Sequence, residues 1–534
     1  MLGDKQDDDS VSAFVAGARR IRGMNVKESI MTPQQAYEDL VRRINEIATL
    51  ASCSAVLSWD HQVYMPAGGG AFRAKQTSLL AGMIHEKFVD PKIGELLSMV
   101  ENSDLVKDPD SAISANIREL RHDYDRETKL PKELVEQLNE TTMLAHNEWA
   151  AARKNNDFKK FQPWLEKIVA LSRRKAEAYG YEGEPYNALL DNYEPGATVD
   201  QILGVFKSLR EELVVLLARI KDAPKQPDPS IVERRYDVGR QQVFGELVAA
   251  AMGYDFGHGR LDIATHPFTT GLGPGDTRIT TRYNPHRLND ALFGTIHEAG
   301  HALYEMGLDK DTDYGMPMSD AASLGIHESQ SRMWENMVGR SKPFWHYFFP
   351  HLKGMFREAL DGVSLDDFYA AVNCVAPSYI RVEADEVTYN LHILLRFELE
   401  RALIKGDLKP ADVAGEWNKR FKNYFGIAVD TDANGCLQDI HWSSGLFGYF
   451  PTYSLGNIYG AQFFAQARKD IPDMDQRFER GDFATLLKWL RENIHKHGKR
   501  YRANDLCKRV TGQPLSHKPL MDYMNKKFGE IYGI

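Results

Sequence analysis

The chain has 534 residues, 43% of them hydrophobic and 26% charged, and 66 Lys and Arg against 75 Asp and Glu give a net charge of −9. This slightly acidic balance disfavours a nucleic-acid-binding protein, and no apolar run reaches the roughly 18–20 residues of a membrane-spanning helix. Four widely spaced cysteines form no Cys-x-x-Cys pair, and the acidic first residues are not typical of a signal or transit peptide. We therefore expect a cytoplasmic protein that binds neither nucleic acid nor membrane.

The first ordered element is expected just after a short N-terminal segment. Residues 1–30 show no sustained hydrophobic period, so we expect a flexible extension there. Thr32 is a suitable helix N-cap and Pro33 suits the first helical position. We expect residues 31–534 to form a single domain, because no Ser/Gly linker, low-complexity tract or internal repeat interrupts them.

Helices dominate the rest of the chain. Residues 131–155, 157–180 and 198–220 all show apolar periodicity of helix length. Residues 258–283 differ, because they are rich in Thr, Ile and Gly, alternate in places and contain the turn Gly-Leu-Gly-Pro-Gly-Asp. The expected fold is mainly α, a large helical body with a small β-ribbon next to the helix that follows.

That next helix carries the pattern His-Glu-x-x-His and is expected between Asn284, which can cap it, and Gly307, which can end it. His297 and His301 lie one turn apart, so their imidazoles project from one face and can hold one metal ion. Glu298 is rotated about 100° from the first histidine, to a position where a general base for water at the metal belongs. The spacing predicts a metal site, with zinc as the expected ion.

A catalytic zinc ion commonly has three protein ligands and one open position, so another element must supply the third ligand. A helix is expected over residues 319–339, capped by Ser319 or Asp320, with His327 and Glu328 near its centre. The chain between the two helices is long enough for an antiparallel return. From spacing alone either Glu328 or His327 can be the third ligand, and both can equally be a packed or solvated polar pair.

Six motifs follow one another between residues 266 and 442. They are His-Pro-Phe at 266–268, Asp-x-Arg-x-Thr at 276–280, His-Glu-x-x-His at 297–301, His-Glu-Ser-Gln at 327–330, Ile-Arg-x-x-Ala-Asp at 380–385 and Gly-x-x-Gln-Asp-x-His-Trp at 435–442. In this order, and all intact, they resemble the carboxypeptidase Taq family of zinc metallocarboxypeptidases. The N-terminal extension is the departure from the family pattern.

The resemblance implies one zinc ion per subunit bound by His297, His301 and Glu328, with Glu298 as the general base that helps zinc-activated water attack the scissile carbonyl. It implies the release of single C-terminal amino acids from peptides, with broad specificity and little activity on proline. It also implies an almost wholly helical fold with a deep groove over the metal, a homodimer, and cobalt as a common substitute for zinc.

An enzyme restricted to C-termini must bind a free carboxylate, and the planar arginine fork suits that task. Arg381 is expected in a long helix opened by Pro377, where an i, i+4 ion pair with Asp385 is the alternative role. Arg278 is expected on the ribbon, where pairing with Asp276 is the alternative. We favour Arg381 as the carboxylate anchor and regard Arg278 as structural or secondary.

Donors for the oxyanion of the transition state are expected in or after the last motif. His441, Tyr449 and Tyr453 are the candidates, although such residues are more often packed with their polar tip satisfied. His266 is either a groove residue or part of a turn. His495 is expected at a solvated helix end.

Two other functions fit the same residues. A zinc endo-oligopeptidase or carboxydipeptidase would use the same metal site in a deep channel, and its products would distinguish it. A non-catalytic helical binding protein with a silent site is the third hypothesis, against which the complete ligand set and the intact Glu298 argue. The expected partners of the leading hypothesis are peptides with a free C-terminus.

Overall fold

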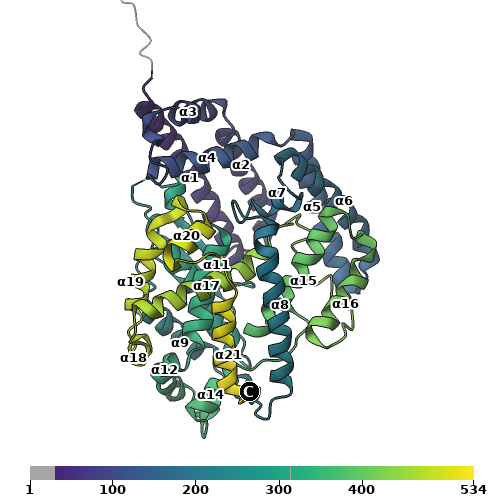
Figure 1. Cartoon of the computed structure of the whole chain (residues 1–534), viewed down its shortest axis with the longest axis vertical. Coiled ribbons are helices and arrows are strands. Elements are labelled where there is room, and N and C mark those ends of the chain that lie inside the picture. Colours follow the sequence, from purple (N-terminus) through teal and green to yellow (C-terminus); the bar gives the residue numbers. More distant parts are fainter. Residues whose placement is uncertain (1–30, 313) are drawn as a thin grey trace, which may run out of the picture.

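The computed structural model describes residues 31–312 and 314–534, and the predicted extension over residues 1–30 lies outside them. Helices make up most of the described chain, together with one three-stranded sheet, which confirms the predicted mainly α fold (Figure 1). Within these ranges, no helix combines the length and the apolar character needed to cross a bilayer.

The N-terminal helices form a layer at one end of the molecule, with a small hydrophobic core of their own (Figure 1). They are α1 (Pro33–Val63), α2 (Gly70–Phe88), α3 (Pro91–Glu101) and α4 (Ala112–Lys129). The start of α1 agrees with the prediction, because the Thr32 hydroxyl accepts from the Gln35 N–H while the Gln35 side chain accepts from the Thr32 N–H.

The larger core surrounds two helices that are buried over most of their length, α15 (Glu386–Lys405) and α17 (Pro451–Asp470). The three helices predicted from periodicity are confirmed as α5 (Lys132–Asn155), α6 (Phe158–Tyr179) and α8 (Val199–Lys221). The other helices of this body are α7 (Tyr186–Leu190), α9 (Val238–Met252), α12 (Lys342–Met355), α13 (Arg357–Leu360), α14 (Leu365–Val372), α16 (Val413–Phe425), α18 (Met474–Phe478), α19 (Ala484–Asn493), α20 (Ala503–Thr511) and α21 (Lys518–Tyr532).

The predicted ribbon is a sheet of three short strands, β1 (Leu261–Ile263), β2 (Thr269–Gly273) and β3 (Asp276–Thr281). β3 lies in the middle, parallel to β1 and antiparallel to β2. Strands β2 and β3 pack against α10 (Leu288–Glu305). The sheet therefore lies directly beside the helix that carries His-Glu-x-x-His.

The boundaries of α10 differ from the prediction. The helix begins at Leu288, because the Asn284 side chain accepts from the His286 N–H and so stabilises a turn that precedes the helix. It ends at Glu305, two residues before the predicted end.

The next helix, α11 (Leu324–Arg332), also begins later than predicted. Ser323 caps it, rather than Ser319 or Asp320, through a hydroxyl that accepts from the N–H three residues further on. The chain then continues as a π-helical turn over Met333–Gly339, a type of distortion that often occurs at functional sites.

Two glycines allow α10 and α17 to approach α11 closely. A Cβ at Gly300 of α10 would lie 2.7 Å from the Cα of Ser331, and a Cβ at Gly460 of α17 would lie 2.9 Å from the carbonyl oxygen of Ser329. The close approach brings Glu328 of α11 within 4 Å of the two histidines of α10.

Candidate active site

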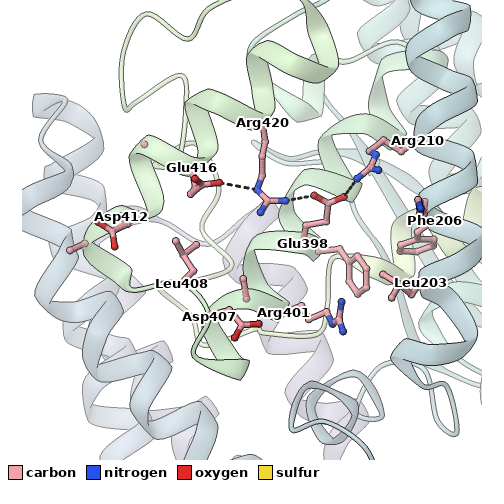
Figure 2. Close-up of a pocket in the computed structure, with 15 residues that line it drawn as sticks. Leu203, Phe206, Arg210, Glu398, Arg401, Asp407, Leu408, Asp412, Glu416 and Arg420 are labelled. Carbon is pink, nitrogen blue, oxygen red and sulfur yellow. Dashed lines mark hydrogen bonds and ion pairs between the residues drawn. The ribbon is translucent and has the colours of Figure 1, made fainter.

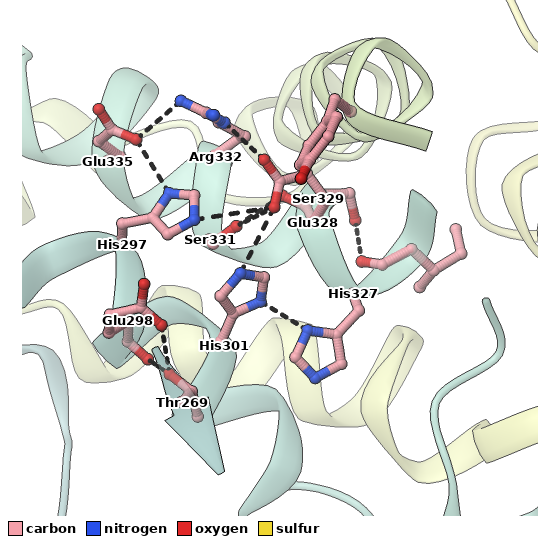
Figure 3. A network of polar contacts seen from close by, with 12 residues as sticks. Thr269, His297, Glu298, His301, His327, Glu328, Ser329, Ser331, Arg332 and Glu335 are labelled. Atoms are coloured by element: carbon pink, nitrogen blue, oxygen red, sulfur yellow. Dashed lines mark hydrogen bonds and ion pairs between the residues drawn. The ribbon is translucent and has the colours of Figure 1, made fainter. Parts of the chain in front are cut away.

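His297 and His301 project from one face of α10, with ring centroids 4.8 Å apart (Figure 3). Glu328 on α11 faces both rings, and its Oε2 lies 3.7 Å from His297 Nε2 and 3.4 Å from His301 Nε2. Two donors that bind one zinc ion at 2.0–2.1 Å in tetrahedral geometry lie about 3.4 Å apart, so this spacing fits a divalent ion. The three residues form a candidate metal site with the donor types of catalytic zinc.

His327, the alternative third ligand, lies behind His301 rather than beside it. Its Nδ1 is 2.5 Å from His301 Nδ1, its Nε2 is 2.8 Å from Glu305 Oε1, and Lys310 pairs with the same carboxylate. If His301 Nε2 is to offer a lone pair to a metal, its Nδ1 must donate to His327, which then donates to Glu305. The geometry therefore favours Glu328 over His327 as the third donor.

Glu335, on the π-helical turn, orients the other imidazole. His297 Nδ1 lies 3.0 Å from Glu335 Oε2, and Arg332 and Arg340 donate to the same carboxylate at 3.1 and 3.2 Å. Burial opposes ionisation of Glu335, but Arg332 and His297 outweigh it and lower the pKa of this carboxyl to about 2. An ionised Glu335 accepts from Nδ1 and leaves Nε2 of His297 facing the metal site.

The two oxygens of Glu328 have different partners. Oε1 accepts from Arg332 Nε at 2.7 Å, and Oε2 faces the two imidazoles (Figure 3). Burial again opposes ionisation, yet Arg332 and His297 hold the pKa of Glu328 well below its usual range. Glu328 is thus an anion whose second oxygen, which also lies 3.3 Å from the Ser331 hydroxyl, is directed at the site.

Glu298 points toward the sheet, away from the three donors (Figure 3). The Thr269 hydroxyl on β2 lies 2.6 Å from Glu298 Oε2, while Oε1 has no hydrogen-bond partner in the described part of the chain. Burial raises the pKa of Glu298, although His297 and Thr269 act against the rise. A carboxylate with one oxygen fixed, one free and a raised pKa can accept and release a proton.

Arg381 lies outside the helix in which it was predicted, in a 3-10 turn over Arg381–Glu383. α15 begins at Glu386, because Asp385 caps it by accepting from two N–H groups of the first turn at 2.9 and 3.0 Å. The predicted alternative pairing of Arg381 with Asp385 is therefore wrong, since the Asp385 oxygens are already engaged at the helix end.

Asp439 is the anionic partner of Arg381. Its Oδ1 lies 3.0 Å from Arg381 Nε and 2.9 Å from Nη2, while Arg396 pairs with Oδ2. Arg381 Nη1 also donates to the Tyr389 hydroxyl at 3.2 Å. Arg381 thus donates hydrogen bonds through Nε and Nη1 and has Nη2 in ion-pair contact with Asp439, which leaves at least the two N–H donors that a bidentate carboxylate requires.

Arg278 makes the contacts of a structural residue. It donates to both oxygens of Asp276, at 2.9 and 2.7 Å, and its guanidinium lies 4.2 Å from the ring centroid of Trp59 on α1. The predicted alternative for Arg278, pairing along its own strand, is therefore what the structure shows.

Polar aromatic residues surround Arg381. Tyr453 has its ring centroid 5.1 Å from the guanidinium and its hydroxyl 3.4 Å from His441 Nε2, and Tyr449 packs 5.4 Å from the same imidazole. Burial lowers the pKa of His441 to about 3 and raises that of Tyr453 far above its usual value, so both groups are neutral and one donates to the other. Burial also lowers the pKa of His266, with Arg381 adding to the effect.

His495 does not lie at a solvated helix end as predicted. It is 1% exposed, and its Nε2 lies 3.0 Å from Gln330 Oε1 on α11. Gln330 belongs to the His-Glu-Ser-Gln motif, so His495 supports the helix that carries Glu328.

Several contributors to the site were missed at the level of sequence, among them Arg332, Thr269, Glu335 and Tyr389. Arg332 and Thr269 carry weak signals, because Arg332 follows Glu328 by four positions on one helix face and Thr269 directly follows the His-Pro-Phe motif. Glu335 and Tyr389 carry none, because the π-helical turn and the distance along the chain hide their contacts.

A separate cavity of about 910 Å³ lies between α8, α15 and α16 (Figure 2). Its charged side chains pair largely with one another, as Arg210 and Arg420 do with Glu398. None of the predicted site residues lines this cavity. The metal site is elsewhere, at the junction of α10, α11 and the sheet.

A helical body in which a His-Glu-x-x-His helix and a carboxylate from a second helix form one metal site defines a metal-dependent peptide hydrolase. The model of the carboxypeptidase Taq (M32) metallopeptidase family matches residues 39–528. The chain belongs to this family and is a metallocarboxypeptidase, which confirms the resemblance found in the sequence.

Similar proteins come from several organisms. The chain is 47% identical to thermostable carboxypeptidase 1 of Thermus thermophilus, over 94% of this chain and 100% of the relative. It is 37% identical to carboxypeptidase 1 of Bacillus subtilis, over 94% and 99% of the two chains. The crystal structure of the M32 carboxypeptidase from Deinococcus radiodurans has a TM-score of 0.90 and 40% identity, and covers 93% of this chain and 100% of that one.

Proposed function

We propose that the chain is a zinc-dependent carboxypeptidase that releases single C-terminal amino acids from peptides, with broad specificity and little activity on proline. The convergence of His297, His301 and Glu328 on one point, with Glu298 alongside, carries this proposal. The preference for a free C-terminus rests on Arg381, and the poor cleavage of proline on the family resemblance.

In this proposal, different residues around the site have different catalytic roles. A zinc ion held by the three donors would polarise the scissile carbonyl and acidify a water molecule. Glu298 takes the proton of that water on its free Oε1 while Thr269 holds Oε2, and then delivers the proton to the leaving amine.

Arg381 binds the terminal carboxylate of the peptide with its two remaining N–H donors. Asp439 keeps the guanidinium in one plane and Arg396 holds Asp439 from behind. We further propose that the pair formed by His441 and Tyr453, joined by a 3.4 Å contact, donates to the negative scissile oxygen, and that Tyr449 and His266 make further contacts to the peptide.

The anchor role is tested with a blocked dipeptide that has a free C-terminus and with its C-terminal amide. We expect kcat/KM for the free acid to exceed that for the amide by at least tenfold, because only the acid engages Arg381. Equal cleavage of both substrates would reject the anchor. Mass spectrometry of longer peptides distinguishes single-residue ladders from the dipeptides or internal fragments of a carboxydipeptidase or an endo-oligopeptidase.

The resemblance also supports a homodimer, a cytoplasmic location and cobalt as a functional substitute for zinc. Sedimentation velocity measures the oligomeric state of the protein. A monomer at micromolar concentration would contradict the proposed homodimer. Metal analysis of the purified protein, followed by zinc or cobalt reconstitution, identifies which ion restores activity.

A further inference from the structure

Tyr389, near the start of α15, contacts both the arginine of the metal site and the proposed carboxylate anchor. The guanidinium of Arg332 stacks on the Tyr389 ring, 4.1 Å from its centroid, and the Tyr389 hydroxyl accepts from Arg381 Nη1 at 3.2 Å. Tyr389 is only 6% exposed, so both contacts form away from bulk water, where such interactions are stronger. None of the sequence motifs includes this residue.

On the metal side, Tyr389 supports the cation that orients Glu328. Arg332 donates to Glu328 through Nε and to Glu335 through Nη1, so its position determines where both carboxylates lie (Figure 3). A guanidinium held at its edge by carboxylates can still tilt about that edge. The flat ring of Tyr389 against its face removes this freedom and thereby fixes Glu328.

On the substrate side, Tyr389 fixes the plane of Arg381. Asp439 holds the Nε and Nη2 edge, and the Tyr389 hydroxyl holds Nη1. Because Asp439 and Tyr389 hold the guanidinium on two sides, its remaining N–H donors point in a fixed direction. A bidentate contact with a carboxylate requires such a fixed direction.

We propose that Tyr389 is a positioning residue that holds Glu328 and Arg381 at a fixed separation and so sets cleavage one residue from the C-terminus. The Cα atoms of adjacent residues lie about 3.8 Å apart, so the metal site and the anchor must match a short, fixed length of peptide. A misplacement of about 1 Å between such groups costs on the order of a hundredfold in rate. The inference rests on the proposed role of Arg381 as the anchor.

Two substitutions separate the two contacts. Tyr389→Phe removes the hydroxyl and keeps the ring, so we expect unchanged metal affinity, a KM for the blocked dipeptide raised about tenfold, and unchanged kcat/KM for its amide. Tyr389→Leu removes both contacts, so we expect the same loss and, in addition, about tenfold weaker zinc retention against a chromophoric chelator. Tyr389→Met, which fills space flexibly, tests the ring contact if the Leu variant fails to fold.

Tyr424 on α16 provides a matched control. Its hydroxyl also accepts from an arginine, Arg210 Nη1 at 3.3 Å, but in the charged cluster of the separate cavity. We expect Tyr424→Phe to change neither the kinetics nor zinc retention, so the general effect of losing a half-buried hydroxyl that contacts an arginine is measured independently.

Arg381→Lys separates failure of this inference from failure of the anchor role. Preference for the free acid that is lost in Arg381→Lys but kept in Tyr389→Phe would overturn the role of Tyr389 alone. Preference kept in both variants would overturn the anchor, and the inference with it. Zinc retention in Tyr389→Leu equal to that of the wild type would overturn the link to Glu328.

Discussion

Gly456 on α17 lies directly against Glu328 on α11, so closely that a Cβ at position 456 would be 2.6 Å from Glu328 Cγ and 2.7 Å from its Cβ. The absence of a side chain at Gly456 therefore gives the third metal donor its space. We expect Gly456→Ala to displace Glu328, to weaken zinc binding at least tenfold and to destabilise the fold by about 1–3 kcal/mol. Competition with a chelator and chemical denaturation measure the two effects.

Gly204 on α8 is the matched control, because a Cβ there meets nothing within 4 Å. Alanine is the better helix former by about 1 kcal/mol, so Gly204→Ala should leave zinc binding intact and stabilise the protein slightly. Normal zinc affinity in Gly456→Ala would show that α11 can shift without moving its ligand.

Glu298→Gln isolates the proposed general base. The amide cannot accept the proton, so we expect kcat to fall by about 100- to 10,000-fold. Because Glu298 points away from the three donors, the variant should retain zinc at the stoichiometry of the wild type. Full activity in Glu298→Gln would mean that another group accepts the proton.

Substitutions of Thr269 test whether the orientation of Glu298 affects the catalytic rate. Thr269→Val keeps the shape of the side chain and removes the hydroxyl that holds Glu298 Oε2. We expect kcat to fall about tenfold with little change in KM, and Thr269→Ser to restore most of the activity. Steady-state kinetics of both variants test this role. A loss in Thr269→Ser as large as that in Thr269→Val would mean that the hydroxyl is not what maintains activity.

Asp439 balances two buried arginines, of which Arg396 has a side chain that is 0% exposed. We expect Asp439→Asn to destabilise the fold by about 3–5 kcal/mol, because a buried charge is left without its anion. Asp475→Asn removes one partner of an exposed ion pair, in which the Asp475 side chain is 42% exposed and the Arg468 side chain 41%. This substitution should lower the unfolding free energy by less than about 1 kcal/mol. Similar losses of unfolding free energy in the two variants would contradict this difference.

Glu400 makes stability depend on pH. It is fully buried and accepts from Tyr186, Trp442 and the Gly448 N–H, but from no cation within residues 31–312 and 314–534, and burial raises its pKa to about 7 from 4.5. Since the folded-state pKa is the higher one, the associated stability is complete below pH 4.5 and is lost as pH rises through 7. The unfolding free energy lost over this pH range through Glu400 is on the order of 3 kcal/mol.

Glu400→Gln removes this titration. We expect the unfolding free energy of the wild type minus that of the variant to decrease by about 3 kcal/mol between pH 5 and pH 8. Burial also raises the pKa of Glu194 to about 7. Because Glu194 is present in both proteins, its contribution cancels when the unfolding free energy of the variant is subtracted from that of the wild type. Parallel pH profiles for the two proteins would rule out the contribution of Glu400.

The sequence was most informative where contacts are local. Helical periodicity located α5, α6 and α8, and the four-residue spacing of His297 and His301 placed both imidazoles on one face. Their roles as ligands, with Glu328, stay predictions that the geometry supports. Helix starts were less predictable, because Asn284 and Asp320 are equally suitable caps in sequence and tertiary contacts determine which turn is used.

Contacts between distant segments had no local signal. Spacing offers Asp385, four residues away, as the alternative partner of Arg381, but the partner in the structure is Asp439, from a segment that the fold brings alongside. Glu335 reaches His297 only because the helix after α11 widens into a π-helical turn. For Arg381 the side chain that spacing offers is already engaged at a helix end. For His297 Nδ1 spacing offers no partner, and only the three-dimensional structure shows it.

The chain of contacts behind the metal donors has a consequence for charge. Three carboxylates, Glu305, Glu328 and Glu335, are matched by three cations, Lys310, Arg332 and Arg340. This framework is therefore close to electroneutral by itself, with neutral imidazoles as metal binding requires. A divalent ion bound there would add two positive charges, of which an ionised Glu298 would offset one, and the remaining positive charge would attract the anionic end of an arriving peptide.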